Sequence, residues 1–349
     1  MTELSIVIPT YNEAGNLPVL IDAIEKLGLD CEIIVADDKS PDGTGEVANR
    51  LNDVYGNIRL LSRSAKMGIA TAVRDATLAS DGRFVAVMDC DMQHPPELLP
   101  AMLEEARRGT AMVIASRYTE GGAPNMSAVR RAISMFATGL AHFMIPQTRN
   151  IRDPLSGYFL FRRDAVDIRS VTSGSYKVLL EILATANLSV SEIPFSFGTR
   201  YSGRSKLGFT ELLRYIGLVL RLSDYRVAKF IAVGLAGMAV NEGLLFLLEP
   251  HAPLLLASAA AVEASIISNF IMNNSWTFRK KVSGAILNRL AKYNAVMIAG
   301  ALLNIGVLGI LVFLHFEYLA ANFVGIIFAF GANYLGSESV VWRFELPLG

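Results

Sequence analysis

The sequence predicts an α/β domain with a mostly parallel sheet, followed by an α-helical domain of four transmembrane spans. Before residue 224, short apolar runs alternate with amphipathic stretches, as in sheets that helices cover on both faces. After it, four long apolar segments follow one another. The 349 residues are 52% hydrophobic and only 18% charged, whereas a soluble domain carries about 25% charged residues. Part of the chain is therefore expected to lie in lipid.

Five apolar runs in the first half are expected to be buried strands, each closed by a polar loop: Leu4 to Pro9, Glu32 to Asp37, Ile58 to Leu61, Arg83 to Met88 and Met112 to Ser116. The helices between them are expected at Asn16 to Leu27, Gly43 to Tyr55, Ile69 to Ala79 and Pro96 to Arg108. Sheets of this kind bind ligands beyond the carboxyl ends of their strands. We therefore look for a site in the loops that follow the strands.

The four apolar segments of the second half are expected to cross a membrane: Val227–Leu248, Leu254–Trp276, Tyr293–Phe313 and Leu319–Val341. Each is close to the roughly 20 residues that a spanning helix needs. Basic residues concentrate on the cytoplasmic side of membrane proteins. They cluster between the second and third spans, whereas the loops at 249–253 and 315–318 have no Lys or Arg. We predict a multi-pass protein of the cell membrane with the α/β domain and both termini in the cytoplasm.

Two amphipathic segments, Val129 to Ile145 and Phe209 to Leu222, are expected to lie in the membrane interface. The second leads directly into the first span, which favours this interpretation over ordinary helices that face the core. The predicted domains are then residues 1–208 with the first interface helix at about 129–145, an interfacial helix at 209–225, and a membrane domain at 226–349.

Composition argues against a nucleic-acid partner, because 32 basic and 32 acidic residues leave a net charge of zero. The two cysteines, Cys31 and Cys90, are too few for a disulfide framework and are expected to be free thiols. The first residues lack a basic start, and Pro9 interrupts the apolar run, so no signal peptide is expected.

An Asp-x-Asp motif, Asp89-Cys90-Asp91, follows the strand expected at 83–88, and Gln93 comes at the next alternate position. Carboxylate and amide oxygens suit Mg²⁺ or Mn²⁺, which often bridge carboxylates to phosphates. The alternative is a solvated acidic turn. The preceding buried strand and the prolines that follow, which turn the chain into the next helix, favour a metal and phosphate site.

A second acidic pair, Asp37-Asp38, ends the strand expected to begin at Glu32, where a carboxylate can bind a ribose or a base. The glycine fingerprint of dinucleotide-binding folds is missing after the first strand, which argues against a hydride-transfer enzyme. Tyr11 and Glu13 stand there instead, suited to stack on a base and to bond its edge.

These motifs together resemble a family-2 glycosyltransferase of the GT-A fold, and most of all the dolichol-phosphate (polyprenyl-phosphate) mannosyltransferases. The segments that carry the resemblance are IVIPTYNEAGNLP, VADDKSPDGT, KMGIATAVRDA, VMDCDMQHPPE, ASRY, IRDPLSGYFLFRRD and EIPFSFGTRYSGRSKLG. They span residues 4–208. The pattern of residues 226–349 is similar to the four-helix GtrA-like membrane domain.

The resemblance implies a role for each motif position. The nucleotide pocket would be lined by Pro9, Tyr11, Glu13, Ala36 and Asp38. A divalent metal, Mg²⁺ or Mn²⁺, would be held against the donor diphosphate by Asp91 and Gln93, with Asp89 and Cys90 beside them. The donor diphosphate or a closing loop would be contacted by Lys177, Arg200 and Lys206. The acceptor lipid phosphate would be received by Arg117, Arg130 and Ser134. The catalytic residues would be Asp89, Asp91 and Arg117.

Several basic residues have plainer alternatives. Lys177 precedes an apolar helix, and the alternative interpretation is a solvated position beside that helix. For the segment around Arg200 and Lys206, the alternative is a linker. A flexible basic loop also suits a lid over phosphates, which we favour. Arg130 also suits an anchor in the membrane interface.

The activity that the resemblance implies is a dolichyl-phosphate β-D-mannosyltransferase. Mannose would pass from GDP-mannose to dolichyl or another polyprenyl phosphate with inversion, giving dolichyl phosphate mannose for glycosylation. The acceptor phosphate is already anionic, so the reaction requires no dedicated base.

Alternatives stay open. One is glucose transfer from UDP-glucose, and another is a membrane half that flips the glycosylated lipid. A processive polysaccharide synthase is disfavoured because its Q-x-x-R-W signature is absent, and an inactive scaffold because the Asp-x-Asp motif is intact.

Polar side chains within the apolar segments are costly in lipid: Glu242, Glu263, Asn269 and Asn273. We expect them to form hydrogen bonds between helices. The alternative is a path for a lipid head group.

Overall fold

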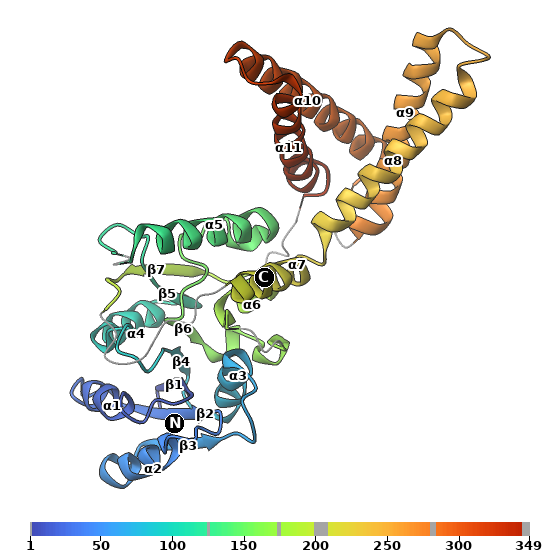
Figure 1. Cartoon of the computed structure of the whole chain (residues 1–349). Coiled ribbons are helices and arrows are strands. Elements are labelled where there is room, and N and C mark those ends of the chain that lie inside the picture. The colour runs from blue at the N-terminus through green and yellow to red at the C-terminus, as the bar shows by residue number, and fades with distance from the viewer. Residues whose placement is uncertain (1, 124–125, 173–175, 199–208, 280–283, 344–349) are drawn as a thin grey trace. The chain divides into compact units, whose positions relative to one another are not determined.

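The computed structural model describes residues 2–123, 126–172, 176–198, 209–279 and 284–343. The chain forms two compact units, Met1–Leu222 and Ser223–Gly349. The first contains the α/β sheet and the second contains the membrane helices (Figure 1). Each unit is described by itself.

The first unit is built on a seven-stranded sheet in the order β3-β2-β1-β4-β6-β5-β7 (Figure 1). Its strands are β1 Leu4–Thr10, β2 Cys31–Asp37, β3 Ile58–Ser62, β4 Phe84–Val87, β5 Met112–Ser116, β6 Phe159–Arg162 and β7 Val190–Pro194. Every pairing is parallel except those that β6 makes with β4 and β5. The predicted mostly parallel sheet is confirmed.

The five predicted strands are present, with ends that differ by at most one residue, but the prediction missed β6 and β7. Strand β6 is short, which leaves little pattern to detect. Strand β7 is half-buried and lies at the sheet edge, so its residues lack the continuous apolar run of a central strand. Both strands matter because they extend the sheet beyond β4 and bring further loops to its carboxyl edge.

Helices cover both faces of the sheet. The apolar side chains of α1 Leu17–Glu25, α2 Thr44–Tyr55 and α4 Leu99–Arg107 pack with Ile6 and Ile8 of β1. Those of α3 Ile69–Ala79 and α6 Val178–Thr185 pack on the opposite face, with Val7. Alternate residues of one strand therefore enter two separate cores, as the two-residue period of a strand requires.

Two further helices of this unit lie at the predicted interface segments: α5 Ala128–Met144 and α7 Phe209–Leu222. They contact each other through the Tyr215 hydroxyl, which donates to the Ala137 carbonyl at 2.6 Å. Large apolar side chains of α5 stay exposed: Val129, Ile133, Met135 and Phe136. Short 3₁₀ helices complete the unit at Pro96–Leu98, Pro146–Thr148, Arg163–Ala165 and Ile168–Ser170.

The second unit consists of two helical hairpins (Figure 1). The helices are α8 Arg226–Leu248, α9 Leu254–Met272, α10 Ile286–Phe313 and α11 Tyr318–Gly336. Helices α9 and α11 each continue into a π-helix, η5 Asn273–Thr277 and η7 Ser337–Val341. All four are long and apolar enough to span a membrane. Helix α10 begins at Ile286, earlier than the span predicted from Tyr293, because the mixed polar and apolar segment 286–292 is also helical.

Aromatic rings and one ion pair hold the hairpin ends together. Phe278 and Trp342 stack at 4.6 Å between ring centroids, and Phe270 and Tyr293 pack against Trp342 and against each other. Nearby, the buried Arg226 guanidinium lies 3.1 Å from Glu338. The aromatic cluster and the ion pair join elements of the two hairpins that are far apart in the sequence.

Candidate active site

The loops at the carboxyl edge of the sheet collect the polar residues of the candidate site. Parallel strands all end at this edge, and β6 begins there because it runs in the opposite direction. Three residues in these loops adopt left-handed backbone without being glycine, Asn12, Lys39 and Met92, with φ of 63°, 55° and 63°. Such conformations cost energy and cluster at functional sites.

The Asp-x-Asp loop follows β4. Asp89 is half-exposed, whereas Asp91 is 9% exposed and Cys90 is buried in the core. Burial raises the pKa of the Cys90 thiol, so this side chain stays neutral. The backbone N–H of Gln93 donates to the Asp91 carboxylate at 3.2 Å, and its side-chain Nε2 donates to the Gly198 carbonyl at 3.4 Å. The loop is thus tied to the segment that follows β7.

A buried histidine orients this loop, and the sequence prediction missed it. His94 is 2% exposed and stacks on Tyr158. Its Nδ1 accepts the backbone N–H of Asp89 at 2.9 Å, which places the ring proton on Nε2. Burial lowers the pKa of His94, so the ring is neutral. The signal was present in the motif itself, directly after Gln93.

Glycine at position 157 makes this packing possible. A Cβ there would lie 3.1 Å from Cε1 of His94 and 3.4 Å from the Asp89 carboxylate. Both distances leave almost no free space, so Gly157 lets the chain entering β6 approach the Asp-x-Asp loop.

A pocket of about 180 Å³ opens at this edge. Four predicted site residues line it: Pro9, Asp89, Arg117 and Lys177. They come from the ends of β1, β4 and β5 and from the residue before α6. The fold therefore brings together side chains that are up to 168 positions apart in the sequence (residues 9 and 177).

Lys177 is a cation of this pocket. Its ammonium group donates to the Leu155 carbonyl at 3.1 Å. Burial and the positive charge of Arg117 lower the pKa of Lys177 to about 8. The side chain is therefore charged at neutral pH and loses its charge in mildly alkaline solution.

Arg117 is held by a carboxylate that the sequence prediction did not select. Asp153 is fully buried and accepts two bonds from the guanidinium, at 2.8 Å from Nε and 2.7 Å from Nη2. It also accepts the Arg117 backbone N–H at 3.0 Å. A guanidinium has five N–H groups, so three remain for other partners. Asp153 thus fixes the direction of Arg117 in the pocket.

The loops after β1 and β2 contain the residues predicted for a nucleotide. The Lys66 ammonium lies 3.7 Å above the Tyr11 ring, and Asn16 donates to the Glu13 carboxylate at 2.6 Å. The methyl group of Ala36 lies in the core, which leaves its backbone for contact with a ligand.

Asp38 has a structural role that the prediction did not include. Its carboxylate forms a buried ion pair with Arg63 and accepts the backbone N–H groups of Met67 and Gly68 at 3.2 and 3.1 Å. Asp38 therefore shapes the loop that leads into α3.

Two of the three residues predicted for an acceptor phosphate lie on α5. Arg130 and Ser134 are one helical turn apart and share a face of the helix. The Tyr118 hydroxyl donates to Ser134 at 2.8 Å, which ties this helix to the segment following Arg117. Arg200 and Lys206 lie outside the described residues.

The donor set of the Asp-x-Asp loop fits a divalent cation. Among the described residues, no group of three or more His, Cys, Asp or Glu side chains is placed to hold a metal by itself. Mg²⁺ is commonly bound by one or two carboxylates together with substrate phosphates, so such a group is not required. Asp89, Asp91 and Gln93 supply oxygen ligands of the appropriate kind.

Comparisons with known proteins agree with this fold. Residues 5–169 match the family described as Glycosyl transferase family 2, and residues 229–342 match the GtrA/DPMS transmembrane domain. A dolichol-phosphate mannosyltransferase of Pyrococcus furiosus is 39% identical, covering 97% of this chain and 99% of the relative. The Saccharomyces cerevisiae enzyme of the same name is 29% identical over 65% of this chain and 88% of its own.

Among solved structures, mannosyl-3-phosphoglycerate synthase from Rubrobacter xylanophilus is similar with a TM-score of 0.49 and 23% identity, covering 65% of this chain and 74% of that one. Glucosyl-3-phosphoglycerate synthase from Mycobacterium tuberculosis, in complex with Mn²⁺ and UDP-glucose, has a TM-score of 0.48 and 21% identity over 64% and 80%.

The sheet, its polar carboxyl edge and the four apolar helices define a membrane-bound glycosyltransferase with a GT-A fold. The full-length match then shows that the chain belongs to the dolichol-phosphate mannosyltransferases of family 2.

Proposed function

We propose that this protein transfers mannose from GDP-mannose to dolichyl or another polyprenyl phosphate, with inversion at the anomeric carbon. The observation that carries the proposal is the relative of that activity class that matches 97% of the chain at 39% identity. The pocket that joins Asp89, Arg117 and Lys177 supports it, because a carboxylate beside two cations suits a diphosphate that leaves together with a divalent metal.

The donor would bind across the loops after β1, β2 and β4. Tyr11 would stack on the base, and Glu13 and the Ala36 backbone would contact the nucleoside. Asp91 and Gln93, beside Asp89, would hold a divalent cation that neutralises the diphosphate. Lys177 would stabilise the charge that develops on the leaving nucleotide, and Arg200 and Lys206 would complete the phosphate contacts.

The acceptor phosphate would lie near Arg117, Arg130 and Ser134. A phosphate oxygen attacks the anomeric carbon, the bond to the nucleoside diphosphate breaks, and no proton has to be removed. The bidentate contact with Asp153 keeps Arg117 pointing into the pocket, so that it orients the phosphate while part of its charge is offset. The in-line placement of the two reactants would then be the main source of the rate acceleration.

The membrane helices would keep the catalytic domain on the cytoplasmic face. The exposed apolar residues of α5 support contact between this helix and the membrane interface. The proposed domains are residues 1–208, an interfacial helix at 209–225, and the membrane domain at 226–349.

Purified protein in lipid nanodiscs tests the activity. Radiolabelled GDP-mannose and UDP-glucose are each supplied with a short polyprenyl phosphate, with Mn²⁺, with Mg²⁺, or with a chelator. We expect metal-dependent label in the organic phase from GDP-mannose. If only UDP-glucose gives label, the transferred sugar is glucose and not mannose. No label from either donor would contradict the proposal.

A further inference from the structure

The two hairpins of the membrane unit are copies of one sequence pattern. Residues 226–241 read RVAKFIAVGLAGMAVN, and residues 289–304 read RLAKYNAVMIAGALLN. Both follow the pattern R-x-A-K-[F/Y]-x-A-V-x-x-A-G-x-x-x-N. The ends of the second helices also correspond: NFIMNNSWTFR at 269–279 aligns with NYLGSESVVWR at 333–343. A repeat of this kind is the mark of a duplicated structural unit.

The structure repeats as well. Each copy ends in a π-helix, and the amide that follows it donates to the first residue of the π-helix: Phe278 to Asn273 at 2.8 Å and Trp342 to Ser337 at 2.9 Å. The equivalent rings Phe278 and Trp342 stack on each other. The two copies are therefore related by an approximate twofold axis.

The repeat places asparagine against glycine on neighbouring helices. A Cβ at Gly237 would lie 2.2 Å from the amide oxygen of Asn269, and one at Gly300 would lie 2.0 Å from that of Asn333. These two pairs are equivalent in the repeat. A third pair, Gly325 with Asn304, has the same geometry at 2.2 Å. Only glycine leaves room for an amide at these three positions.

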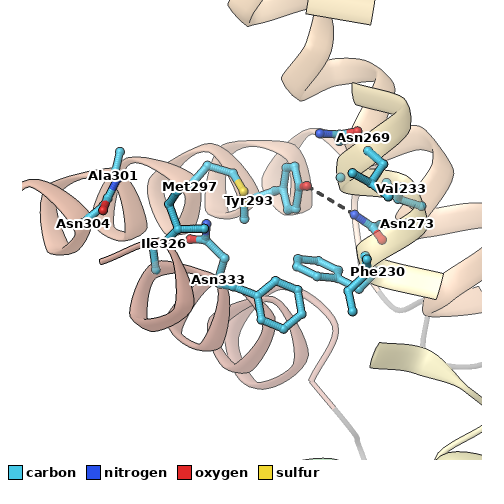
Figure 2. A pocket seen from close by; sticks show the side chains of 15 residues that line it. Phe230, Val233, Asn269, Asn273, Tyr293, Met297, Ala301, Asn304, Ile326 and Asn333 are labelled. Carbon is cyan, nitrogen blue, oxygen red and sulfur yellow. Dashed lines mark hydrogen bonds between the residues drawn. The ribbon is translucent and has the colours of Figure 1, made fainter. Parts of the chain in front are cut away.

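A cavity of about 450 Å³ lies between the two copies (Figure 2). Equivalent residues line it from both sides: Phe230 with Tyr293, Gly234 with Met297 and Asn269 with Asn333. Asn273 and Asn304 complete a set of four amides, as Figure 2 shows. None of the described residues that line the cavity is ionisable at neutral pH.

The four amide oxygens in this cavity accept no hydrogen bond from any residue that the structure describes. Asn273, 1% exposed, donates to the Tyr293 hydroxyl at 3.2 Å, and this is the one hydrogen bond that joins any of the four to a neighbouring helix in the described chain. The expectation that intramembrane asparagines bond between helices is thus met by Asn273 but not by Asn269. Contacts of these amide oxygens with glycine Cα–H groups are weaker than a hydrogen bond from an N–H or O–H donor.

We propose that this cavity binds the uncharged, hydroxyl-rich head group of a membrane glycolipid, such as a hexosyl group. Amides that remain without donors in lipid are costly, and sugar hydroxyls supply both donors and acceptors. The rings of Phe230 and Tyr293 offer flat apolar faces of the kind a sugar ring packs on. The absence of basic residues in the lining disfavours a phosphate. The proposal does not depend on the catalytic activity proposed above.

Photolabelling of the full-length protein in nanodiscs tests the proposal. Two probes share one diazirine-bearing alkyl chain, and one has a β-mannoside head group while the other has a phosphate. We expect the mannoside to label peptides of α8–α11 that line the cavity, with about tenfold higher yield than the phosphate, as one or two buried hydrogen bonds imply. Equal labelling by the two probes would overturn the proposal.

Two variants form a matched pair, because Asn304 lines the cavity whereas its counterpart in the repeat, Asn241, does not. Asn304→Leu keeps the side-chain shape and should lower mannoside labelling about tenfold, whereas Asn241→Leu should leave it unchanged. Asn269→Leu provides a second cavity variant if Asn304→Leu does not fold. Labelling unchanged in the folded cavity variants would contradict the proposal.

Competition identifies the source of the head group. An unlabelled short-chain polyprenyl phosphate mannose and an unlabelled neutral alkyl mannoside are each added before irradiation. Displacement by either supports a sugar site and tells whether the lipid is phosphorylated, and displacement by neither overturns it. Mannosyl transfer, measured on the same samples, should be retained by Asn304→Leu, so loss of the proposed activity and loss of the cavity ligand are separate results.

Discussion

The two units of this protein bury polar side chains in different ways. In the α/β unit, the buried carboxylates of Asp38 and Asp153 are each paired with an arginine, Arg63 and Arg117, and also accept backbone N–H groups. In the membrane unit, three asparagine amides are seated against glycine, and their buried oxygens lack donors among the described residues. The first arrangement fixes loops around a site, whereas the second leaves hydrogen-bonding capacity for a ligand.

The largest effect is expected from the Asp-x-Asp loop. Asp91→Ala should lower mannosyl transfer by about 10³-fold, because the charge of the leaving diphosphate would lose its stabilisation. The control is Asp164→Ala, whose carboxylate is largely exposed in the turn after β6. Initial rates with saturating metal check the prediction, and near-normal activity of Asp91→Ala would exclude this residue from the site.

The next effect concerns a paired charge in the α/β unit. Arg63→Met would leave Asp38 buried without its partner, which costs about 3–5 kcal/mol. Arg108→Met removes an exposed ion pair with Glu105, for which the loss is about 0–1 kcal/mol. The midpoint of thermal inactivation should fall markedly only for Arg63→Met. Equal midpoints for the two variants would contradict a stabilising role for the buried pair.

A smaller loss of stability is expected in the membrane unit, where Arg226 pairs with Glu338. Glu338→Gln should destabilise this unit by about 3 kcal/mol, because Arg226 stays buried. The matched change is Asn274→Gln, at the equivalent position of the other copy. The protein has two tryptophans, Trp276 and Trp342, both in this unit, so their fluorescence follows its unfolding. A larger shift for Asn274→Gln would contradict the prediction.

The smallest effect is a change in pH dependence. The pKa of Lys177 is lowered to about 8, so its positive charge is present below that pH and lost above it. Transfer should therefore decline as the pH rises through about 8, and Lys177→Arg should move the decline to higher pH because arginine stays charged. Lys26→Arg, at an exposed position, is the control. An identical profile for Lys177→Arg would remove Lys177 from the phosphate contacts.

Much of the fold could be predicted because its signals are local. Apolar runs closed by polar loops identified the strands that end at the site, and four long apolar segments identified the membrane helices. The positions of Asp89 and Asp91 followed from a strand that ends just before them. The site roles that the resemblance implies remain predictions, and Arg200 and Lys206 lie outside the described residues.

The remaining features depend on which segments meet in space. The alternation of apolar strands with amphipathic helices determined by itself a mostly parallel sheet with a polar carboxyl edge. The hydrophobic period and the turn residues that give this signal act over only a few positions in the sequence. Only the tertiary structure decided that Asp153 holds Arg117, that His94 holds the Asp89 backbone, and that the two halves of the membrane unit enclose a cavity. Arg117 and Asp153 are distant in the chain, as are the two halves of the membrane unit, and the path of the backbone between Asp89 and His94 decides whether their groups meet. No local sequence pattern identifies these contacts.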